Sequence, residues 1–372
     1  MSKAPLYIGL MSGTSMDGVD GVLADFTTPS RPQVLAHAFV PMPNTLAVEL
    51  LALNSPCDNE LHRAALAANA LIRLYAQVVD TLLASSRLGA QAITAIGAHG
   101  QTVRHQPQLH DETGYTLQLN NPALLAELSG IDVVADFRSR DVAAGGQGAP
   151  LVPAFHKGLF GRTDQTVAVL NIGGISNLSV LHPDGRVQGW DCGPGNALMD
   201  HWCLQHTGQP FDRDGAWAAS GTVVPDLLGR LLREDYLHQT PPKSTGRDLF
   251  NPPWLQAHLS HFADLSAVDV QATLTAFTTQ ACLNDVRQHA ADARQLIVCG
   301  GGALNLHLMQ SLQQGLPGVE VISSEAMGLP PLQVEATAFA WLAYKCMQRE
   351  TASLPSVTGA QGARVLGAVY PR

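Results

Sequence analysis

A strand, a glycine-rich polar turn and a second strand follow one another twice in this chain. The first copy covers residues 6–26 and the second covers residues 165–181. A third strand candidate follows each copy, at residues 34–40 and 187–190. Two halves that begin in the same way predict a duplicated domain, in which each half contributes one hairpin.

The turn of the first copy brings small hydroxyls, glycines and two carboxylates into one loop. Glycine lets backbone N–H groups approach an anion without a Cβ in the way. Asp17 or Asp20 would hold a hydrated magnesium ion, which prefers one or two carboxylates together with substrate phosphate oxygens. Taken alone, the loop also fits a hairpin turn without a ligand. The expected phosphate-binding residues here are Gly13, Thr14, Ser15, Met16, Asp17, Gly18, Val19 and Asp20.

The length and composition indicate a folded chain with two cores. It has 372 residues, of which 46% are hydrophobic and 14% are charged, with 34 glycines and 23 prolines. This length exceeds the usual size of one core, so we expect two domains of similar size. The low charge and the many turn residues are typical of a compact globular protein rather than a disordered one.

The charge and the N-terminus restrict the partners and the compartment. The net charge is −9 and no run of Lys or Arg occurs, which argues against a nucleic-acid or anionic-membrane binder. The start of the chain lacks the apolar core of a signal peptide, and no segment approaches 18 continuous apolar residues. We therefore expect a cytoplasmic protein. The six cysteines contain no C-x-x-C pair, so we interpret them as free, mostly buried thiols.

Helices are predicted between the strands. Asp58 is placed to cap a helix over residues 59–87, and residues 266–269 read as a capping box before a second apolar stripe. A strand over 294–299 enters a glycine triplet. A final Ala-rich helix over 333–348 is expected to cross between the two domains.

Several further segments resemble the anhydro-N-acetylmuramic acid kinase family, within the superfamily of sugar kinases, heat-shock ATPases and actin. The first is the loop at residues 13–20, and the others span nearly the whole chain in order. They are His99-Gly100-Gln101-Thr102, Ala135-Asp136-Phe137-Arg138, Asn171-Ile172-Gly173-Gly174-Ile175-Ser176-Asn177, Asp191-Cys192-Gly193-Pro194-Gly195-Asn196, Cys299-Gly300-Gly301-Gly302 and Glu335. One departure is visible, because Cys192 stands where the family leads us to expect Thr.

The resemblance implies both a fold and a reaction. The fold is α/β, a two-domain actin-like ATPase fold built from a duplicated ribonuclease H-like unit, with a central cleft between the domains. We expect residues 1–138 and 345–372 in the first domain and 139–344 in the second. The implied reaction uses ATP, Mg²⁺ and water to open 1,6-anhydro-N-acetylmuramic acid and phosphorylate O6, as part of peptidoglycan recycling. A homodimer is also implied.

Asp191 is the expected general base for this reaction. In the family's mechanism a carboxylate at this position takes a proton from the water that attacks the anomeric carbon. Partial burial beside Trp190, Cys192 and Pro194 would raise its pKa and improve it as a base. An Asx turn before Gly193 is the structural alternative.

Two further glycine-rich segments complete the expected nucleotide site. Asn171, Gly173 and Gly174 would form the second phosphate hairpin, although a plain turn also fits them. The resemblance assigns Gly300, Gly301 and Gly302 to adenosine, and glycines that only permit packing are the alternative. No G-x-x-x-x-G-K-[ST] sequence occurs, so a P-loop enzyme is not supported.

Arg138 is the expected partner of the lactyl carboxylate of a muramic sugar, because guanidinium and carboxylate form two parallel hydrogen bonds. A surface salt bridge is the alternative. His99, Gln101 and Glu335 would hold sugar hydroxyls or the N-acetyl group, although each is also compatible with a structural role.

Two other functions share parts of this pattern. An amino-sugar hydroxyl kinase would use the same ATP loops without water in its stoichiometry. A chaperone-like or filament-forming ATPase would need a peptide-binding module or extensive polymer contacts, and the 372 residues leave no room for an added domain.

Overall fold

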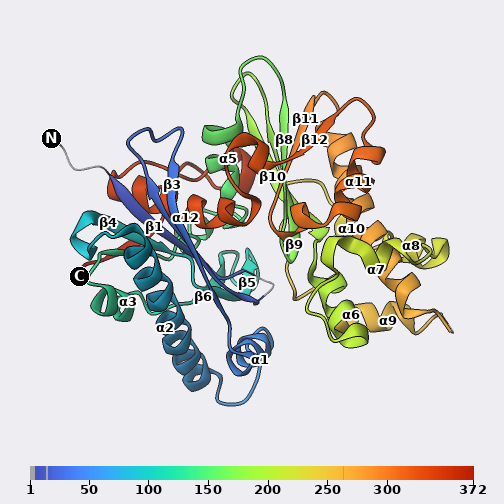
Figure 1. Cartoon of the computed structure of the whole chain (residues 1–372), viewed down its shortest axis with the longest axis horizontal. Coiled ribbons are helices and arrows are strands. Elements are labelled where there is room, and N and C mark those ends of the chain that lie inside the picture. Colours follow the sequence, from blue (N-terminus) through green and yellow to red (C-terminus); the bar gives the residue numbers. More distant parts are fainter. Residues whose placement is uncertain (1–4, 14–15, 263) are drawn as a thin grey trace. The chain divides into compact units, whose positions relative to one another are not determined.

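The computed structural model describes residues 5–13, 16–262 and 264–372, and they form two compact units. Unit 1 comprises Met1–Leu159 and Leu332–Arg372, and unit 2 comprises Phe160–Pro331. Each unit contains its own mixed β-sheet with helices packed on it (Figure 1).

The sheet of unit 1 has six strands. They are β1 (Leu6–Met11), β2 (Gly18–Asp25), β3 (Gln33–Pro41), β4 (Ile93–Ala98), β7 (Val133–Ala135) and β13 (Ala368–Tyr370). Their order is β13-β7-β4-β1-β2-β3. The strands β1, β2 and β3 form an antiparallel meander, β1 and β4 are parallel, β4 and β7 are parallel, and β13 pairs antiparallel with β7. A separate antiparallel hairpin consists of β5 (Gln101–Pro107) and β6 (Gly114–Leu119).

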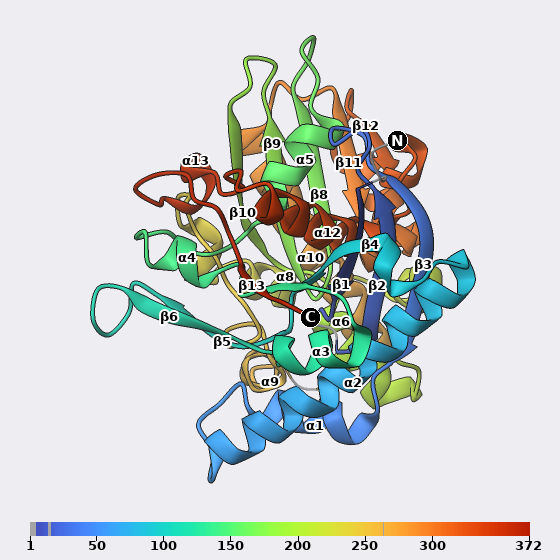
Figure 2. The same ribbon diagram turned by 90° about the vertical axis from the view of Figure 1, so that its left-hand side faces the viewer.

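Two long helices cover opposite faces of this sheet, α2 (Glu60–Ser86) and α12 (Val334–Met347). A Cβ on Gly9 of β1 would lie 1.8 Å from the Ala336 carbonyl oxygen, so glycine there lets α12 lie directly on the strand. A Cβ on Gly21, on the other face, would lie 2.3 Å from Val78 of α2. Figure 2 shows α2 running beside β2 and β3. The remaining helices of unit 1 are α1 (Asn44–Ala52), η1 (Ala90–Ala92), α3 (Pro122–Ser129), α4 (Ser139–Val142), α5 (Val152–Phe160, whose last residue falls in unit 2) and α13 (Pro355–Thr358).

The sheet of unit 2 has five strands. They are β8 (Val167–Ile172), β9 (Ile175–Leu181), β10 (Val187–Pro194), β11 (Gln295–Cys299) and β12 (Glu320–Ser323). Their order is β10-β9-β8-β11-β12. The strands β8, β9 and β10 form an antiparallel meander, whereas β11 runs parallel to both β8 and β12.

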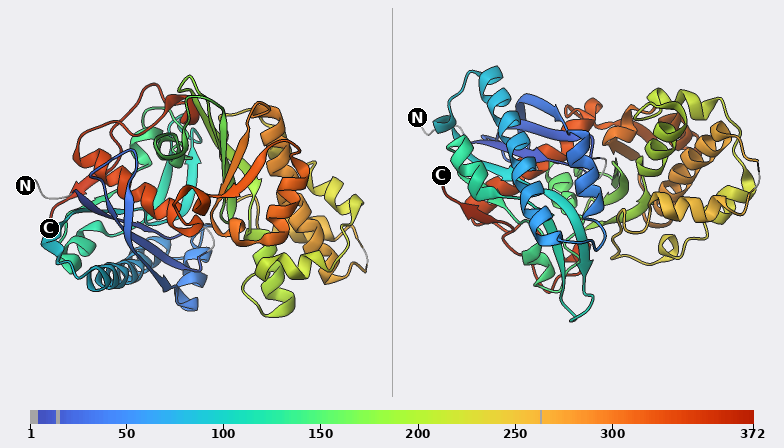
Figure 3. Two further views of the ribbon diagram at one scale, coloured as in Figure 1. Left: turned by 45° about the horizontal axis from the view of Figure 1, so that its top comes forward. Right: turned by 90° about the horizontal axis from the view of Figure 1, so that it is seen from below.

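One face of this sheet carries the hydrophobic core of unit 2. Alternate residues of β8, such as Ala168, Leu170 and Ile172, enter that core, together with Trp190 of β10 and Phe277 of α10 (Ala267–His289). The helix α10 packs along β9 and β10 and also contacts α11 (Leu306–Gly315), which packs on β12 (Figure 3). The other helices of unit 2 are α6 (Ala197–Thr207), η2 (Arg213–Gly215), α7 (Ala216–Ala219), α8 (Pro225–Leu231), η3 (Asp235–His238), α9 (Pro252–Leu259), η4 (Gly301–Leu304) and η5 (Ser324–Met327), and η6 (Pro331–Gln333) lies at the junction with unit 1.

The two sheets share one topology. The shared part covers five strands: reading from β3 in unit 1 and from β10 in unit 2, three antiparallel strands in reverse chain order are followed by two strands parallel to β1 or β8. Unit 1 adds β13 as an antiparallel edge strand. The predicted duplicated α/β fold is therefore confirmed, including the hairpin at the start of each half. The predicted cleft between the domains stays a prediction.

The expected domain boundaries were wrong on both sides. Residues 139–159 and 332–344, which we assigned to the second domain, belong to unit 1. The reason is α12, whose close packing on β1, β2 and β4 ties the whole helix to the first sheet. It therefore does not cross between the units as expected.

The predicted helix ends were partly right. Ser266 caps α10 as expected, because its Oγ accepts from the Asp269 N–H and donates to Asp269 Oδ2 at 2.7 Å. At the start of α2, however, the cap residue is Asn59, in the left-handed conformation (φ 55°), without a side-chain capping bond from Asp58. The helix α2 is long and apolar enough to cross a membrane by length and composition, but half of its apolar window is buried, as in a core helix.

Candidate active site

The first glycine-rich loop connects β1 to β2 and is fixed at both ends. Ser12 Oγ lies 3.1 Å from Tyr75 Oη and donates to the Gly100 carbonyl at 3.1 Å. Gln101 Nε2 donates to the Gly13 carbonyl at 3.2 Å. Met16, the first residue described after the turn, has a left-handed backbone (φ 55°) and a buried side chain. Thr14 and Ser15 lie outside the described residues.

The two candidate metal ligands at the end of this loop differ in setting. Asp17 is exposed and its carbonyl accepts from the Met42 N–H at 2.9 Å. Asp20 lies on β2, where one carboxylate oxygen is 2.9 Å from His37 Nε2. Burial raises the pKa of Asp20, and the negative charge of Asp17 adds to that rise against the opposing effect of His37. Carboxylate oxygens are ligands that Mg²⁺ prefers, so these two side chains are candidates to hold it.

The segment after β4 connects this loop to a buried histidine. The His99 N–H donates to the Leu10 carbonyl at 3.1 Å, so the segment continues the pairing of β4 with β1. Burial, and secondly the Arg138 charge, hold the pKa of His99 well below its usual range, so the ring is neutral at pH 7. Gln101 is also buried, and its Oε1 has no hydrogen-bond partner among the described residues.

Arg138 contacts His99 directly. Its Nε and Nη2 lie 3.3 Å and 2.9 Å from His99 Nε2, and its Nη1 donates to the Gly148 carbonyl at 2.9 Å. The Gly148 N–H in turn donates to the buried Asp141 carboxylate at 2.9 Å. The structure thus brings Arg138 and His99 into contact in unit 1, whereas the Gln101 side chain bonds to the first glycine-rich loop. Glu335 also belongs to unit 1, in the first turn of α12, and is half-buried.

The second glycine-rich hairpin packs on the N-terminus of α6. The Gly173 carbonyl accepts from the Asn196 N–H at 2.8 Å, and the Gly174 carbonyl accepts from the Gly195 N–H at 2.9 Å. A Cβ on Gly195 would lie 2.2 Å from the Gly173 carbonyl oxygen, so that glycine is needed for this close approach. Asn171 is buried on β8, directly opposite Asn177 of β9.

The glycine triplet follows β11 and forms the start of η4. Gly300 has a left-handed backbone (φ +76°), and a Cβ there would lie 2.5 Å from Asn171 Oδ1. A Cβ on Gly302 would lie 2.4 Å from Ile172. The triplet therefore packs against the end of β8, so packing alone accounts for two of its three glycines. Gly301 is exposed.

Asp191 lies on β10, at the edge of the sheet of unit 2. Its side chain is nearly buried, and its Oδ2 accepts from the Thr245 N–H at 2.9 Å. The main chain of Asp191 is held as well, because Tyr236 Oη donates to its carbonyl at 2.8 Å. The pairing with β9 shifts register between Asp191 and Gly193, whose φ of +148° no larger residue adopts easily.

The amino-acid sequence of this chain is clearly related to those of known proteins. The family model described as anhydro-N-acetylmuramic acid kinase matches residues 5–372. The chain belongs to the anhydro-N-acetylmuramic acid kinase family. It is 64% identical to the anhydro-N-acetylmuramic acid kinase of Variovorax paradoxus, over 98% of this chain and 99% of that one. It is 62% identical to the one of Albidiferax ferrireducens, with the same coverage.

A more distant similarity links this family member to a solved structure. The activator of the 2-hydroxyisocaproyl-CoA dehydratase from Clostridium difficile, with bound ADPNP, matches 94% of this chain and 99% of that one at 12% identity, with a TM-score of 0.47. The family relationship makes this chain a kinase, an enzyme that transfers a phosphoryl group to a sugar.

Cys192, the departure from the family pattern, points away from the face that carries Asp191. Cys192 lies at the register shift after Asp191 and enters the core next to α10, as Trp190 does. Burial raises the pKa of the Cys192 thiol well above its usual range, with a further contribution from Cys282. Its thiol is therefore a core group in this kinase. All six cysteines are free and five are buried, as predicted.

Several residues around Asp191 were missed by sequence reasoning. Asn171, Asn177 and Asp191 are directly opposite one another on β8, β9 and β10, so their side chains share one face of the sheet. Asn177 stands in the quoted family motif but received no role. Tyr236 and Thr245 come from a segment more than 40 residues further along the chain, and no local pattern marks them.

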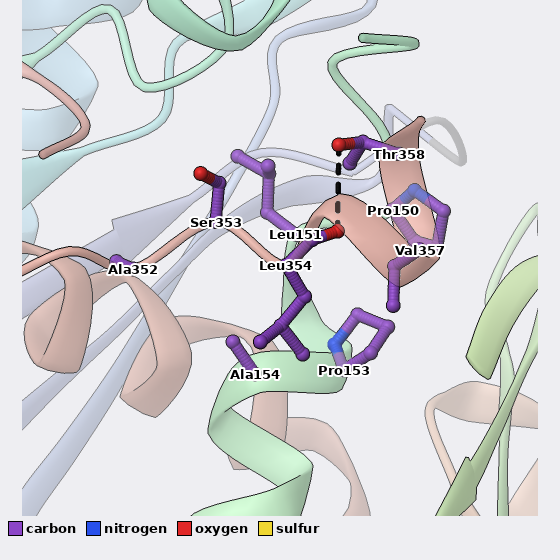
Figure 4. Close-up of a pocket in the computed structure, with 9 residues that line it drawn as sticks. All are labelled: Pro150, Leu151, Pro153, Ala154, Ala352, Ser353, Leu354, Val357 and Thr358. Atoms are coloured by element: carbon purple, nitrogen blue, oxygen red, sulfur yellow. Dashed lines mark hydrogen bonds between the residues drawn. The ribbon is translucent and has the colours of Figure 1, made fainter. Parts of the chain in front are cut away.

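Unit 1 also contains a small apolar pocket, shown in Figure 4. It is lined by Pro150, Leu151, Pro153, Ala154, Ala352, Ser353, Leu354, Val357 and Thr358. The Thr358 hydroxyl donates to Asp141 Oδ1 at 2.9 Å and lies 3.5 Å from the Leu354 carbonyl oxygen. None of the predicted site residues lines this pocket, and it offers no charged group to a sugar or a nucleotide.

Proposed function

We propose that this kinase converts 1,6-anhydro-N-acetylmuramic acid, ATP and water into N-acetylmuramic acid 6-phosphate and ADP. Water attacks the anomeric carbon, the bond from C1 to O6 breaks, and O6 attacks the γ-phosphorus of ATP, which releases ADP. The proton of the water passes to a general base. Attack from the face opposite the breaking bond is the geometry of inverting glycoside hydrolysis.

Asp191 is the proposed base, and its fixed carboxylate is the observation that supports this role most directly. A base must be held within hydrogen-bond reach of the proton that it removes. The Thr245 N–H holds Oδ2, and Tyr236 Oη holds the main chain of the same residue. The bonded N–H comes from a residue 54 positions away, so this contact depends on the tertiary structure, unlike the local bond of an Asx turn.

The nucleotide is proposed to bind at the glycine-rich segments of both units. Gly13, Thr14, Ser15, Met16, Asp17, Gly18, Val19 and Asp20 would surround the terminal phosphates in unit 1. Asn171, Gly173 and Gly174 would do so in unit 2, and Gly300, Gly301 and Gly302 would contact adenosine. Backbone N–H groups present the positive ends of their dipoles to the phosphates. This suits a chain that has a net charge of −9 and no run of Lys or Arg.

Mg²⁺ is proposed to bind at Asp17 and Asp20, directly or through water. Both carboxylates lie at the end of the loop that is proposed to surround the phosphates, and a pair of hard oxygen ligands suits this ion. When bound, the ion would neutralise the charge that develops on the phosphoryl oxygens.

The sugar is proposed to bind beside Arg138, His99, Gln101 and Glu335. The guanidinium would pair with the lactyl carboxylate, and neutral His99 would hold it in place. Gln101 Oε1, which has no hydrogen-bond partner among the described residues, is an acceptor suited to a hydroxyl or the N-acetyl N–H.

The decisive experiment uses ¹⁸O-labelled water with Mg-ATP and the anhydro sugar. The proposal predicts a 6-phosphosugar labelled at C1, and Asp191→Asn should reduce label incorporation and phosphosugar formation together, to a small residual rate. Asp226→Asn is the control, because Asp226 is an exposed carboxylate at the start of α8. Unlabelled phosphosugar would instead support an amino-sugar hydroxyl kinase.

We also propose a cytoplasmic homodimer that acts in peptidoglycan recycling. The net charge of −9 argues against nucleic-acid and anionic-membrane partners. The dimer rests on the family resemblance. Light scattering of the purified chain distinguishes it from a monomer, and accumulation of the anhydro sugar in a deletion strain tests the pathway.

A further inference from the structure

Asp191 occupies a position that its own sheet holds poorly. The strand β10 is the edge of the sheet of unit 2, so no strand in the described part of the chain pairs with its outer side. The register with β9 also shifts immediately after Asp191. A residue at a register shift on an edge strand is held by few contacts from its own sheet. A general base needs a fixed position, because a small displacement of a catalytic group lowers the rate steeply.

The segment 236–245 takes the place of the missing neighbour. Tyr236 Oη donates to the Asp191 carbonyl at 2.8 Å, and the Asp191 N–H donates to the Lys243 carbonyl at 3.4 Å. The Thr245 N–H donates to the carboxylate itself at 2.9 Å. Both main-chain groups and one carboxylate oxygen of Asp191 are therefore bound by this one segment.

The Lys243 ammonium closes the segment on itself. Its Nζ donates to the Leu237 carbonyl at 3.3 Å and to the Tyr236 carbonyl at 3.5 Å, and it lies 5.0 Å from the centre of the Tyr236 ring. Tyr236 and Lys243 each contact the Asp191 main chain, and the Lys243 side chain also bonds to residues 236 and 237. It therefore links the two ends of the segment.

Asp285 of α10 anchors the closed segment to the core. Its Oδ2 accepts from Trp190 Nε1 at 2.7 Å and lies 4.0 Å from Lys243 Nζ. One carboxylate therefore fixes the residue before Asp191 on β10 and the ammonium of the segment. The Lys243 and Asp285 side chains are only 2% and 7% exposed.

A buried ion pair of this kind is a poor source of stability. Removing two charges from water costs several kcal/mol per ion, and well-packed apolar replacements are often neutral or stabilising. The use of such pairs that is best documented is to fix one arrangement among several. Here the arrangement that they fix is the backbone around Asp191.

We propose that Tyr236, Lys243 and Asp285 are positioning residues, which hold the Asp191 carboxylate in place through the closed segment 236–245. This inference rests on the proposed role of Asp191 as the base. None of the three needs to touch the substrate, so their loss should lower kcat and leave KM nearly unchanged.

Tyr236→Phe is the sharpest test, because it keeps the ring beneath Lys243 and deletes only the hydroxyl that donates to Asp191. We expect kcat to fall roughly 10- to 100-fold, with the KM values for sugar and ATP within about twofold of wild type. The control is Trp254→Phe, which also deletes one hydrogen bond of an aromatic side chain, to Glu234 at 2.9 Å, at a partly buried position packed against the core of unit 2. Its kcat should stay within about twofold of wild type.

A second variant separates positioning from stability. Lys243→Met combined with Asp285→Asn removes both charges and retains an acceptor for Trp190 Nε1. We expect a thermal midpoint near that of wild type together with a kcat reduced at least tenfold. A wild-type kcat in this folded double variant would overturn the inference.

Combination with Asp191→Asn shows whether Tyr236 acts through Asp191. If it does, adding Tyr236→Phe to Asp191→Asn lowers the residual rate no further. A further tenfold loss would overturn the inference, as would a wild-type kcat for Tyr236→Phe alone, and both results leave the base role of Asp191 intact. Full activity of Asp191→Asn would instead overturn the proposed function, and this inference with it.

Discussion

The guanidinium of Arg138 faces the imidazole of His99 with two nitrogens, Nε at 3.3 Å and Nη2 at 2.9 Å from the same ring nitrogen, Nε2. Because burial keeps His99 neutral, Nε2 accepts these bonds and the ring proton sits on Nδ1. The histidine thus orients the guanidinium through hydrogen bonds to a neutral ring.

Arg138→Lys should therefore weaken sugar binding. Lysine cannot contact His99, the Gly148 carbonyl and a carboxylate with one planar fork, so we expect KM for the anhydro sugar to rise about 10- to 100-fold. Steady-state kinetics with an analogue that lacks the lactyl carboxylate is the control. Equal losses on both sugars would argue against a carboxylate partner.

Asp17 and Asp20 should respond differently to amide substitution. The Asp20 carboxylate is already shared with His37, whereas Asp17 is exposed at the end of the loop. We expect Asp17→Asn to raise the Mg²⁺ concentration at half-maximal rate about tenfold, and Asp20→Asn to raise it less. Magnesium titration of the initial rate measures both. The reverse order would make Asp20 the main ligand.

Gly300→Ala should destabilise unit 2 far more than Gly318→Ala. Both glycines have a positive φ, +76° and +86°, which strains a residue with a Cβ, and Gly300 combines it with a ψ of −179°, a region essentially restricted to glycine. Only at Gly300 would the new Cβ meet other atoms, at 2.5 Å from Asn171 Oδ1, whereas nothing lies within 4 Å at Gly318. Urea unfolding should show a loss of several kcal/mol for Gly300→Ala. If the two variants lost similar amounts of unfolding free energy, backbone strain alone would explain the effect, without the contact at Asn171.

Acid should destabilise the fold partly through His156. Burial lowers the pKa of His156 to about 3 from its usual 6.5. Between these values the unfolded chain binds a proton that the folded chain does not, so the free energy of unfolding falls as the pH falls, by up to about 1.4 kcal/mol per pH unit. His156→Gln should flatten this slope between pH 6.5 and 4.5 in urea titrations. His62→Gln, at an exposed position on α2, should not change it.

Local sequence patterns predicted much of the fold. The two glycine-rich hairpins, the strand before Gly300 and the capping of α10 by Ser266 all lie as expected. Each depends on residues within a few positions of one another, and short-range sterics and hydrogen bonds decide them without help from the rest of the chain.

The packing of α12 was not predictable in the same way. Its apolar residues show that it is buried, but they do not show against which sheet. Gly9 and Gly97 decide this, because a Cβ at either position would lie within 2.1 Å of a carbonyl oxygen of α12. These glycines lie over 230 residues from the helix, and their role follows only from the sheet that places them side by side.

The sequence by itself determined which chemical groups this protein carries, namely Asp191, Arg138 and the glycine-rich turns. Only the tertiary structure decided how Asp191 is held, by Tyr236, Lys243 and Thr245 from a distant segment and by Asp285 from α10. The physical reason is that a residue type fixes charge and hydrogen-bonding capacity, whereas burial and partners depend on contacts that form only when the chain folds.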